Sequence, residues 1–179
     1  MKMLADGLNV APMLAAIRPA MWDEITARQD FAGSPHRDTR SILLRGPVNV
    51  ANAQDDVECI AYPATQHPGI RPAFEDLLSE IPIDMAELGR VMLVSLKPGG
   101  HITRHADEGA YAERFSRFHV ALQSDDGNEF VSGIDAARMK PGECWWFDHR
   151  LPHEVINRSA RERIHLIFDA RVSGLYQGE

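Results

Sequence analysis

The second half of the chain is divided into short apolar segments, which are separated by Gly, Pro, Asp or Asn residues. Turn residues of this kind recur about every 8–12 residues, a spacing typical of antiparallel sandwiches and jelly rolls. The segments expected to be strands are 90–96, 101–107, 116–123, 129–132, 136–139, 144–148, 154–157 and 163–170. The sequence therefore predicts a mainly β (α+β) fold whose core, residues 90–170, is a sandwich or a jelly roll.

The first half is expected to support this core. Apolar residues at three- and four-residue spacing in 8–28 predict one amphipathic helix or two short ones. The other elements expected before residue 90 are strands at 41–45 and 57–63, a helix at 74–81 and a short helix at 84–88. With 179 residues, the chain is expected to be a single domain in which 1–89 form the support region.

Composition excludes several classes of protein. A hydrophobic content of 44% is ordinary for a globular protein, and a net charge of −7 argues against non-specific binding to nucleic acid. Cys59 and Cys144 have no metal-binding spacing, so two reduced thiols are expected. The first residues resemble neither a membrane-spanning helix nor a cleavable leader. We therefore expect a cytoplasmic protein that binds neither nucleic acid nor membranes.

Three residues in the second half have the pattern of a metal site. His105 and Asp107 form an H-x-D pair, and His153 follows 48 positions after His105. Residues two apart on a strand point to the same face, so the pair can converge on one point, and a distant strand can supply His153. Two imidazoles and one carboxylate are the facial ligand set of non-haem Fe(II) oxygenases. Arg163, ten residues after His153, could anchor the far carboxylate of a keto-diacid bound to the iron.

Around these residues the chain resembles the aspartyl/asparaginyl β-hydroxylase family of 2-oxoglutarate-dependent oxygenases. The resemblance rests on LKPGGHITRH at 96–105, RFH at 117–119, PGECWWF at 141–147, HEVIN at 153–157 and Arg163. It covers roughly the second half of the chain and agrees in order and spacing.

The resemblance implies a double-stranded β-helix, a jelly-roll or cupin-like core with N-terminal flanking helices. It also implies that the H-x-D pair and the distal histidine hold Fe(II), and that 2-oxoglutarate and O2 are cosubstrates. Arg163 would bind the 5-carboxylate of 2-oxoglutarate, and Arg117 and His119 would contact the same molecule. The implied reaction is hydroxylation of an amino acid, an amino-acid-like small molecule or an Asp or Asn residue of a peptide.

Two of the expected strands divide their residues by polarity. In 116–123, Arg117 and His119 share one face, and in 163–170, Arg163 and His165 do the same. The opposite faces carry the apolar residues Phe118, Val120 and Leu122 and Ile164, Leu166 and Phe168. A barrel whose interior binds an anionic cosubstrate would produce this division, and so would a polar face exposed to water. The coincidence with the H-x-D pair and the distal histidine favours the barrel interior.

One departure from the family pattern bears on the chemistry. The animal branch has Gly where this chain has Asp107, so the resemblance implies the more common two-His-one-carboxylate site and disfavours a halogenase. The loop between His105 and Arg117 is also longer than in that branch, which leaves the substrate open. Two alternatives remain: a cupin-like metal enzyme that does not use 2-oxoglutarate, and a non-catalytic jelly-roll binding module.

Polar residues outside the core offer further candidates. Arg40 and Arg45 flank an expected strand, where either could lie at the mouth of the barrel and hold the substrate. His101 is interpreted as a rim residue, and His36, in a loop, as solvated. His149 precedes His153 by four and could be mistaken for the distal ligand.

Overall fold

The computed structural model describes residues 1–23, 26–30 and 32–173. Its strands are β1 (Lys2–Ala5), β2 (Thr39–Pro47), β3 (Cys59–Ala61), β4 (Met85–Leu96), β5 (His101–His105), β6 (Ser116–Gln123), β7 (Asn128–Ser132), β8 (Asp135–Ala137), β9 (Cys144–Phe147), β10 (His153–Asn157) and β11 (Arg163–Val172). Its α-helices are α1 (Ala11–Ala16), α2 (Ala27–Asp30), α3 (Ile70–Ser79) and α4 (Ala110–Arg114), and short 3-10 helices cover Pro19–Asp23, Val50–Asn52 and Pro63–Gln66.

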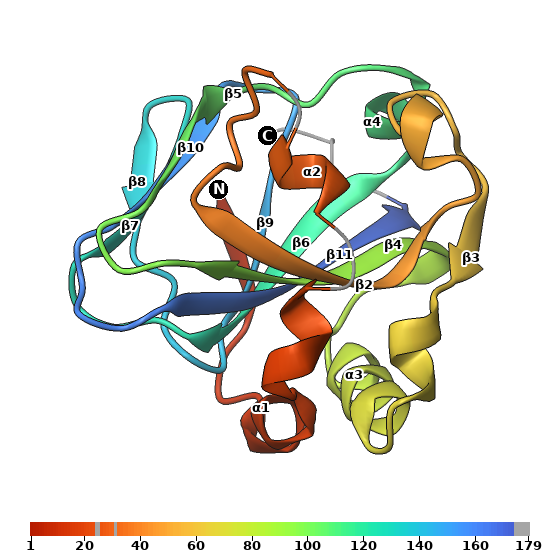
Figure 1. Cartoon of the computed structure of the whole chain (residues 1–179), viewed down its shortest axis with the longest axis horizontal. Coiled ribbons are helices and arrows are strands. Elements are labelled where there is room, and N and C mark those ends of the chain that lie inside the picture. Colours follow the sequence, from red (N-terminus) through yellow and green to blue (C-terminus); the bar gives the residue numbers. More distant parts are fainter. Residues whose placement is uncertain (24–25, 31, 174–179) are drawn as a thin grey trace.

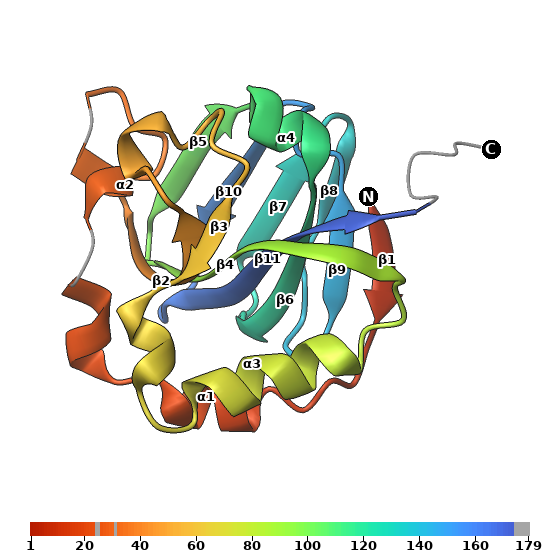
Figure 2. The same cartoon turned by 90° about the vertical axis from the view of Figure 1, so that its right-hand side faces the viewer.

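The strands form two antiparallel sheets. The large sheet has seven strands in the order β1-β9-β6-β11-β4-β2-β3, and the small sheet has four in the order β5-β10-β7-β8. The small sheet lies to one side of the large one, and α1 and α3 lie together beneath the large sheet (Figures 1 and 2). This arrangement confirms the predicted mainly β jelly-roll fold with flanking helices. No helix in the described part of the chain is long and apolar enough to cross a membrane.

The two faces of the large sheet have different partners. The apolar face, which carries Phe118 and Val120 of β6 and Leu166 and Phe168 of β11, belongs to one core cluster with residues of α1 and α3. The opposite face meets the small sheet, because the His119 ring packs edge-on against Phe130 of β7 with ring centroids 5.4 Å apart. Strand periodicity left open whether the polar face lies inside the barrel or is exposed to water. In the structure it lies inside the barrel.

One element of the first half was predicted with the wrong type. The segment 84–88 was expected to be a short helix, but residues 85–88 are instead the start of the long strand β4, which begins at Met85. Their backbone pairs with the end of β11, with Leu88 opposite Ala170 and Glu87 opposite Arg171. This long-range pairing overrides the local helical pattern.

Other boundaries shift by a few residues. The helix expected at 74–81 begins earlier, at Ile70, and segment 8–28 holds two short α-helices with a 3-10 helix between them. Residues 24 and 25 of that segment lie outside the described residues. Strand β1 was not predicted; it pairs antiparallel with β9, and Lys2 lies opposite Trp146.

Candidate metal centre

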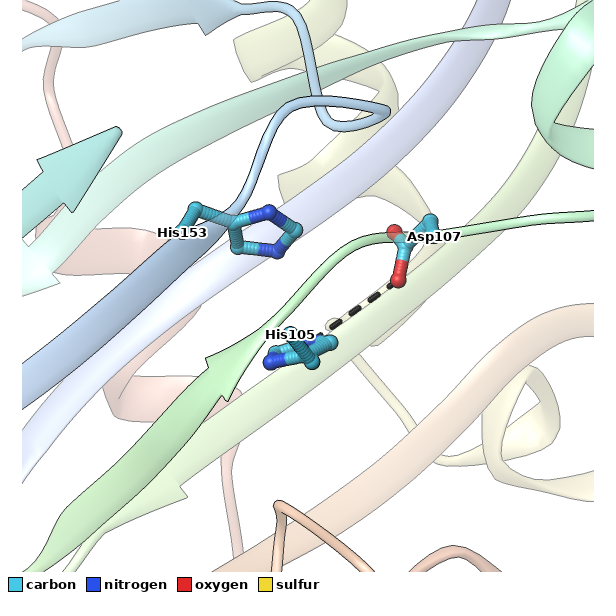
Figure 3. Close-up of side chains that lie close together, drawn as sticks. All are labelled: His105, Asp107 and His153. Carbon is cyan, nitrogen blue, oxygen red and sulfur yellow. Dashed lines mark ion pairs between the residues drawn. The ribbon is translucent and has the colours of Figure 1, made fainter. Parts of the chain in front are cut away.

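Three side chains from β5, from the loop that follows it and from β10 lie close together (Figure 3). One potential ligand atom from each of His105, Asp107 and His153 lies within 4.8 Å of the others. Strands β5 and β10 are antiparallel neighbours in the small sheet, and His105 is the direct partner of His153. Strand β5 ends at His105, so strand alternation alone does not place Asp107. Instead, its backbone N–H donates to the carbonyl of His149 at 2.9 Å.

Both histidines are held with one ring nitrogen free. Nδ1 of His105 lies 2.8 Å from the carbonyl oxygen of Thr103, and Nδ1 of His153 lies 2.9 Å from that of Leu151. A carbonyl oxygen can only accept, so Nδ1 carries the hydrogen in both rings and Nε2 keeps its lone pair. Backbone contacts of this kind are the usual way in which proteins orient metal-binding histidines.

The ligand set is in the protonation state that a metal requires. Burial alone would raise the pKa of Asp107, but the Arg117 guanidinium outweighs it and lowers this pKa to about 2. Burial lowers the pKa of His153 to about 4 and also lowers the pKa of His105. At neutral pH the carboxylate is therefore ionised and both imidazoles are neutral, which is the form in which each binds a metal ion.

Arg117 connects the metal ligand to the interior of the barrel. Its Nη1 donates to Oδ2 of Asp107, while Nε and Nη2 donate to the two carboxylate oxygens of Asp169 at 2.8 and 2.9 Å. The hydroxyl of Tyr111 donates to the same carboxylate at 3.1 Å. Arg117, which the resemblance assigned to the cosubstrate, thus has two carboxylates as partners in this structure. It orients Asp107 and leaves Oδ1 facing His105, at 3.7 Å from Nε2.

Arg163, unlike Arg117, has no carboxylate partner among the described residues. The side chain is buried, and burial lowers its pKa to about 9, so it is charged at neutral pH. Within the described residues it forms no ion pair, and its Nη2 donates a hydrogen bond to Nδ1 of His165 at 3.1 Å. Because His165 accepts at Nδ1, its Nε2 carries a hydrogen, and this atom is buried without a partner. A buried cation next to an unused N–H donor is a site suited to a carboxylate.

His119 lies between this site and the candidate ligands. Its ring packs edge-on against Phe147 at 5.1 Å and His165 at 5.6 Å, and Phe147 in turn contacts His153 at 5.1 Å between ring centroids. Nδ1 of His119 is buried without a hydrogen-bond partner. Ring contacts thus connect the candidate ligand His153, through Phe147 and His119, to His165, the hydrogen-bond partner of Arg163.

A cavity of about 930 Å³ opens beside His105 and Asp107, on the side of β2 and β4. Neither Arg40 nor Arg45 lines it. Arg40 is exposed, pairs with Glu162 at 2.5 Å, and lies on the face of β2 opposite to the cavity residue Ser41. Arg45 donates instead to the carbonyl oxygen of Leu88 at 3.2 Å.

The cavity is lined by cationic residues other than Arg40 and Arg45. Besides Arg117, they are Arg28 and Arg90, and the neutral histidines His36 and His149 also line it. His36, expected to be solvated, is buried, and its ring meets that of His105 edge-on at 4.9 Å. The density of polar residues around the first long strand was the signal for this region, but it could not identify which side chains turn inward.

Three comparisons with known proteins agree with this geometry. Residues 61–172 match the model of the aspartyl/asparaginyl beta-hydroxylase family. A curated relative, L-proline cis-4-hydroxylase of Rhizobium meliloti (strain 1021), is 28% identical over 92 residues, which are 51% of this chain and 33% of the relative. The chain thus spans about a third of the length of that relative.

The fold is also found among solved structures. An oxidoreductase of the 2OG-Fe(II) oxygenase family from Burkholderia pseudomallei superposes with a TM-score of 0.51 at 17% identity, and covers 88% of this chain and 80% of its own. This likeness shows the jelly-roll fold. Because the family model matches more than half of the residues and spans all three candidate ligands, the chain belongs to the aspartyl/asparaginyl β-hydroxylase family.

Proposed function

We propose that the protein is an Fe(II)- and 2-oxoglutarate-dependent dioxygenase. It would hydroxylate an amino acid, an amino-acid-like small molecule or an Asp or Asn residue of a peptide. The observation that carries this proposal is the cluster of His105, Asp107 and His153, in which both imidazoles are neutral with Nε2 free and the carboxylate is ionised. Two histidines and one carboxylate fit Fe(II) and leave coordination positions open. The activity of the R. meliloti relative supports an amino acid as the substrate.

Each group of the site has a separate role in the proposed reaction. Bound iron and 2-oxoglutarate supply the oxidising chemistry, in which O2 is consumed and succinate and CO2 are released. Arg163 binds the far carboxylate of 2-oxoglutarate, because it is a buried cation without an ion-pair partner in the described chain. Arg117 keeps Asp107 ionised and oriented. Phe130 and Phe147 pack against the rings of His119 and His153 and would exclude water from that side of the site.

A cupin-like metal enzyme that does not use 2-oxoglutarate would need no buried cation behind the metal site. Arg163 and the unpartnered Nε2–H of His165 therefore favour the 2-oxoglutarate-dependent reaction. A non-catalytic module would not need all three candidate ligands in a metal-binding protonation state.

The first test is an anaerobic titration of the metal-free protein with Fe(II) and then 2-oxoglutarate. We expect tight binding of one iron and a weak visible charge-transfer band when 2-oxoglutarate is added. His153→Ala should abolish both. His101→Ala is a matched control, because this histidine lies on the neighbouring strand and pairs with Glu154 at 2.9 Å, outside the cluster. The control should bind iron as the wild type does.

The outcomes separate the alternatives. A band that is lost in His153→Ala establishes the site, and a screen of amino acids for succinate release then identifies the substrate. Bound iron without a band would favour the cupin-like enzyme. No iron binding would contradict an enzyme of this class and favour the binding module.

A further inference from the structure

Two cations line the large cavity without a carboxylate to balance them. Of its three arginines, Arg117 is paired with Asp169 and Asp107, whereas Arg28 and Arg90 form no ion pair within residues 1–23, 26–30 and 32–173. Both residues are half-buried, and even partial burial of a charge without a partner is unfavourable, so an unbalanced guanidinium in a cavity indicates a ligand of opposite charge. Neither residue was predicted from the sequence, and Arg28 lies outside the segment that matches the family.

Arg28 is fixed next to the metal site. Its Nη2 lies 3.1 Å from Nε2 of His36, and the His36 ring contacts the ring of His105. A guanidinium N–H can only donate, so Nε2 of His36 accepts this hydrogen bond. Burial lowers the pKa of Arg28 itself only to about 10, so it is charged at neutral pH. Its Nη1 is buried and has no hydrogen-bond partner.

Arg90 is held equally firmly on β4. Its guanidinium carbon lies 3.5 Å from the ring centroid of Tyr111, and Nη2 donates to the carbonyl oxygens of Ala53 and Asp56. Its Nε is buried without a hydrogen-bond partner. Both guanidinium groups thus keep one buried N–H donor unused although other atoms of the same group are anchored.

The wall behind Arg90 is rigid as well. The segment that contains Ala53 is tied to α4, because the N–H of Tyr111 donates to the carbonyl oxygen of Gln54 at 3.0 Å. Gly109 has φ +92°, and a Cβ there would lie 2.5 Å from the same oxygen, so only glycine permits this close approach. The positions of Arg90 and of this wall are therefore set before a ligand binds.

With Fe(II) and 2-oxoglutarate bound, the site would still have two positive charges that no negative charge balances, those of Arg28 and Arg90. Iron(II) and 2-oxoglutarate carry opposite double charges, and the two carboxylates of Asp107 and Asp169 are matched in number by the two guanidinium groups of Arg117 and Arg163, so these charges sum to zero. The remaining acidic lining residue, Glu108, is exposed. Arg28 and Arg90 alone among the charged residues inside the described cavity then lack a counter-charge.

We propose that this cavity binds a dicarboxylate substrate, such as an acidic amino acid, with one carboxylate on Arg28 beside the metal site and the other on Arg90. The planar guanidinium fork suits a carboxylate, and a volume of about 930 Å³ admits both acid groups and the carbon chain between them. This inference rests on the proposed function, because it names the substrate class of the same site.

The test is calorimetric titration of the anaerobic protein, loaded with Fe(II) and saturating 2-oxoglutarate, with four probes. L-Aspartate and L-glutamate are compared with their uncharged isosteres L-asparagine and L-glutamine. We expect the better-bound acid to bind roughly 10- to 100-fold more tightly than its amide, the difference expected for a charge-assisted hydrogen bond. Arg28→Gln and Arg90→Gln should each remove this preference, and Arg28→Lys and Arg90→Lys should restore part of it.

Arg40→Gln is the matched control, because Arg40 is a nearby arginine on the opposite face of β2. It should leave the preference unchanged. Thermal unfolding of each variant shows whether it folds. If Arg90→Gln does not fold, the lysine variants still test the proposal. Equal binding of acid and amide, no binding of either acid at millimolar concentration, or an unchanged preference in the folded Arg28 and Arg90 variants would overturn the proposal.

The proposed function fails in a different way. It fails if iron and 2-oxoglutarate produce no band, and the same four probes are then titrated into the metal-free protein. An acid preference that still depends on Arg28 and Arg90 would retain the anion site, whereas its absence would remove that site too.

Discussion

The two faces of the large sheet are made by the same strands but have opposite characters. On β11, Leu166 and Phe168 face α1 and α3, within an apolar core that needs nothing outside the chain. Arg163 and His165 alternate with them and face the barrel interior, where buried polar atoms lack partners. The apolar face therefore stabilises the fold. The unpaired polar atoms of the interior face lower the stability of the ligand-free protein, and a bound ligand can offset this loss.

This difference predicts that a substitution on one face changes stability and that one on the other face changes ligand binding. The largest effect is expected at Arg163. Arg163→Met, which keeps most of the volume, should raise the 2-oxoglutarate concentration needed for half-maximal succinate release roughly 100-fold, because it removes the cation of a buried charge pair. Iron binding should stay within about twofold of wild type.

The unfolding free energy of the metal-free Arg163→Met protein should not fall, because no carboxylate in the described chain loses its partner. Arg161→Met is the control, since Arg161 is exposed and pairs with Asp125 at 2.5 Å. It should change neither quantity. An unchanged 2-oxoglutarate requirement in Arg163→Met would take this residue out of the cosubstrate site.

Leu166→Ala tests the apolar face. This fully buried side chain belongs to the core beneath the large sheet, so its truncation should lower the free energy of unfolding by about 3 kcal/mol. Urea denaturation measures this loss. Iron affinity at low temperature, where the variant is still folded, should equal that of wild type. A matching loss of iron affinity would show that the two faces are not independent.

Asp169→Asn tests how the interior face positions a metal ligand. Asp169 holds Arg117 through two hydrogen bonds, and Arg117 in turn orients Asp107. Without this carboxylate, the charge of Arg117 is balanced by Asp107 alone, which then competes with the metal. We expect iron affinity to fall about 10- to 100-fold, the range found for groups that orient metal ligands.

Tyr111→Phe keeps the Asp169 carboxylate and serves as the milder companion variant. It removes the 3.1 Å hydrogen bond to Asp169 and the 2.7 Å hydrogen bond that the hydroxyl accepts from the backbone N–H of Arg90. Its iron affinity should lie between those of wild type and Asp169→Asn. If anaerobic iron titration of a folded Asp169→Asn protein matches wild type, Asp107 does not depend on this network.

The smallest expected effect is a dependence of stability on pH. Burial is the first cause that lowers the pKa of His36, His119 and His165 below the ordinary value of 6.5. Below about pH 6.5 the unfolded chain binds protons that the folded chain does not, so stability falls as the pH falls. These three groups alone should cost the metal-free protein about 2 kcal/mol between pH 7 and pH 6, and the lowered pKa values of His105 and His153 add to this cost.

Urea unfolding of the metal-free protein at the two pH values measures this cost. His119→Phe should reduce the pH dependence, because it removes one of the three groups. A free energy of unfolding that is equal at pH 7 and pH 6 would contradict the neutral, buried state of these histidines.

Strands in the second half were predicted well because their signals are local. The alternation of polar and apolar residues in 116–123 agrees with the observed strand Ser116–Gln123, and the turn residues fall at its ends. Residues 84–88 were misjudged, since their strand exists through pairing with β11. Strand β1 was missed for the same reason, because it is short and depends on β9.

The candidate metal ligands could be named from spacing and residue type, since few residue types bind iron and the H-x-D pair keeps its two side chains close in any extended chain. The partners of the arginines could not be named. Arg117 was assigned to the cosubstrate, yet the structure pairs it with Asp169, which lies 52 positions away in the chain.

The jelly-roll class, the two different faces of β6 and β11, and the identities of the candidate ligands could all be predicted from the sequence. These follow from the two-residue period of a strand and from the chemistry of single side chains. Only the tertiary structure decided that Arg28, His36 and Arg90 meet in one cavity, and that Arg40 and Arg45 do not reach it. Their positions depend on strand register and on loops that pack across the barrel, and no local pattern of residues encodes either.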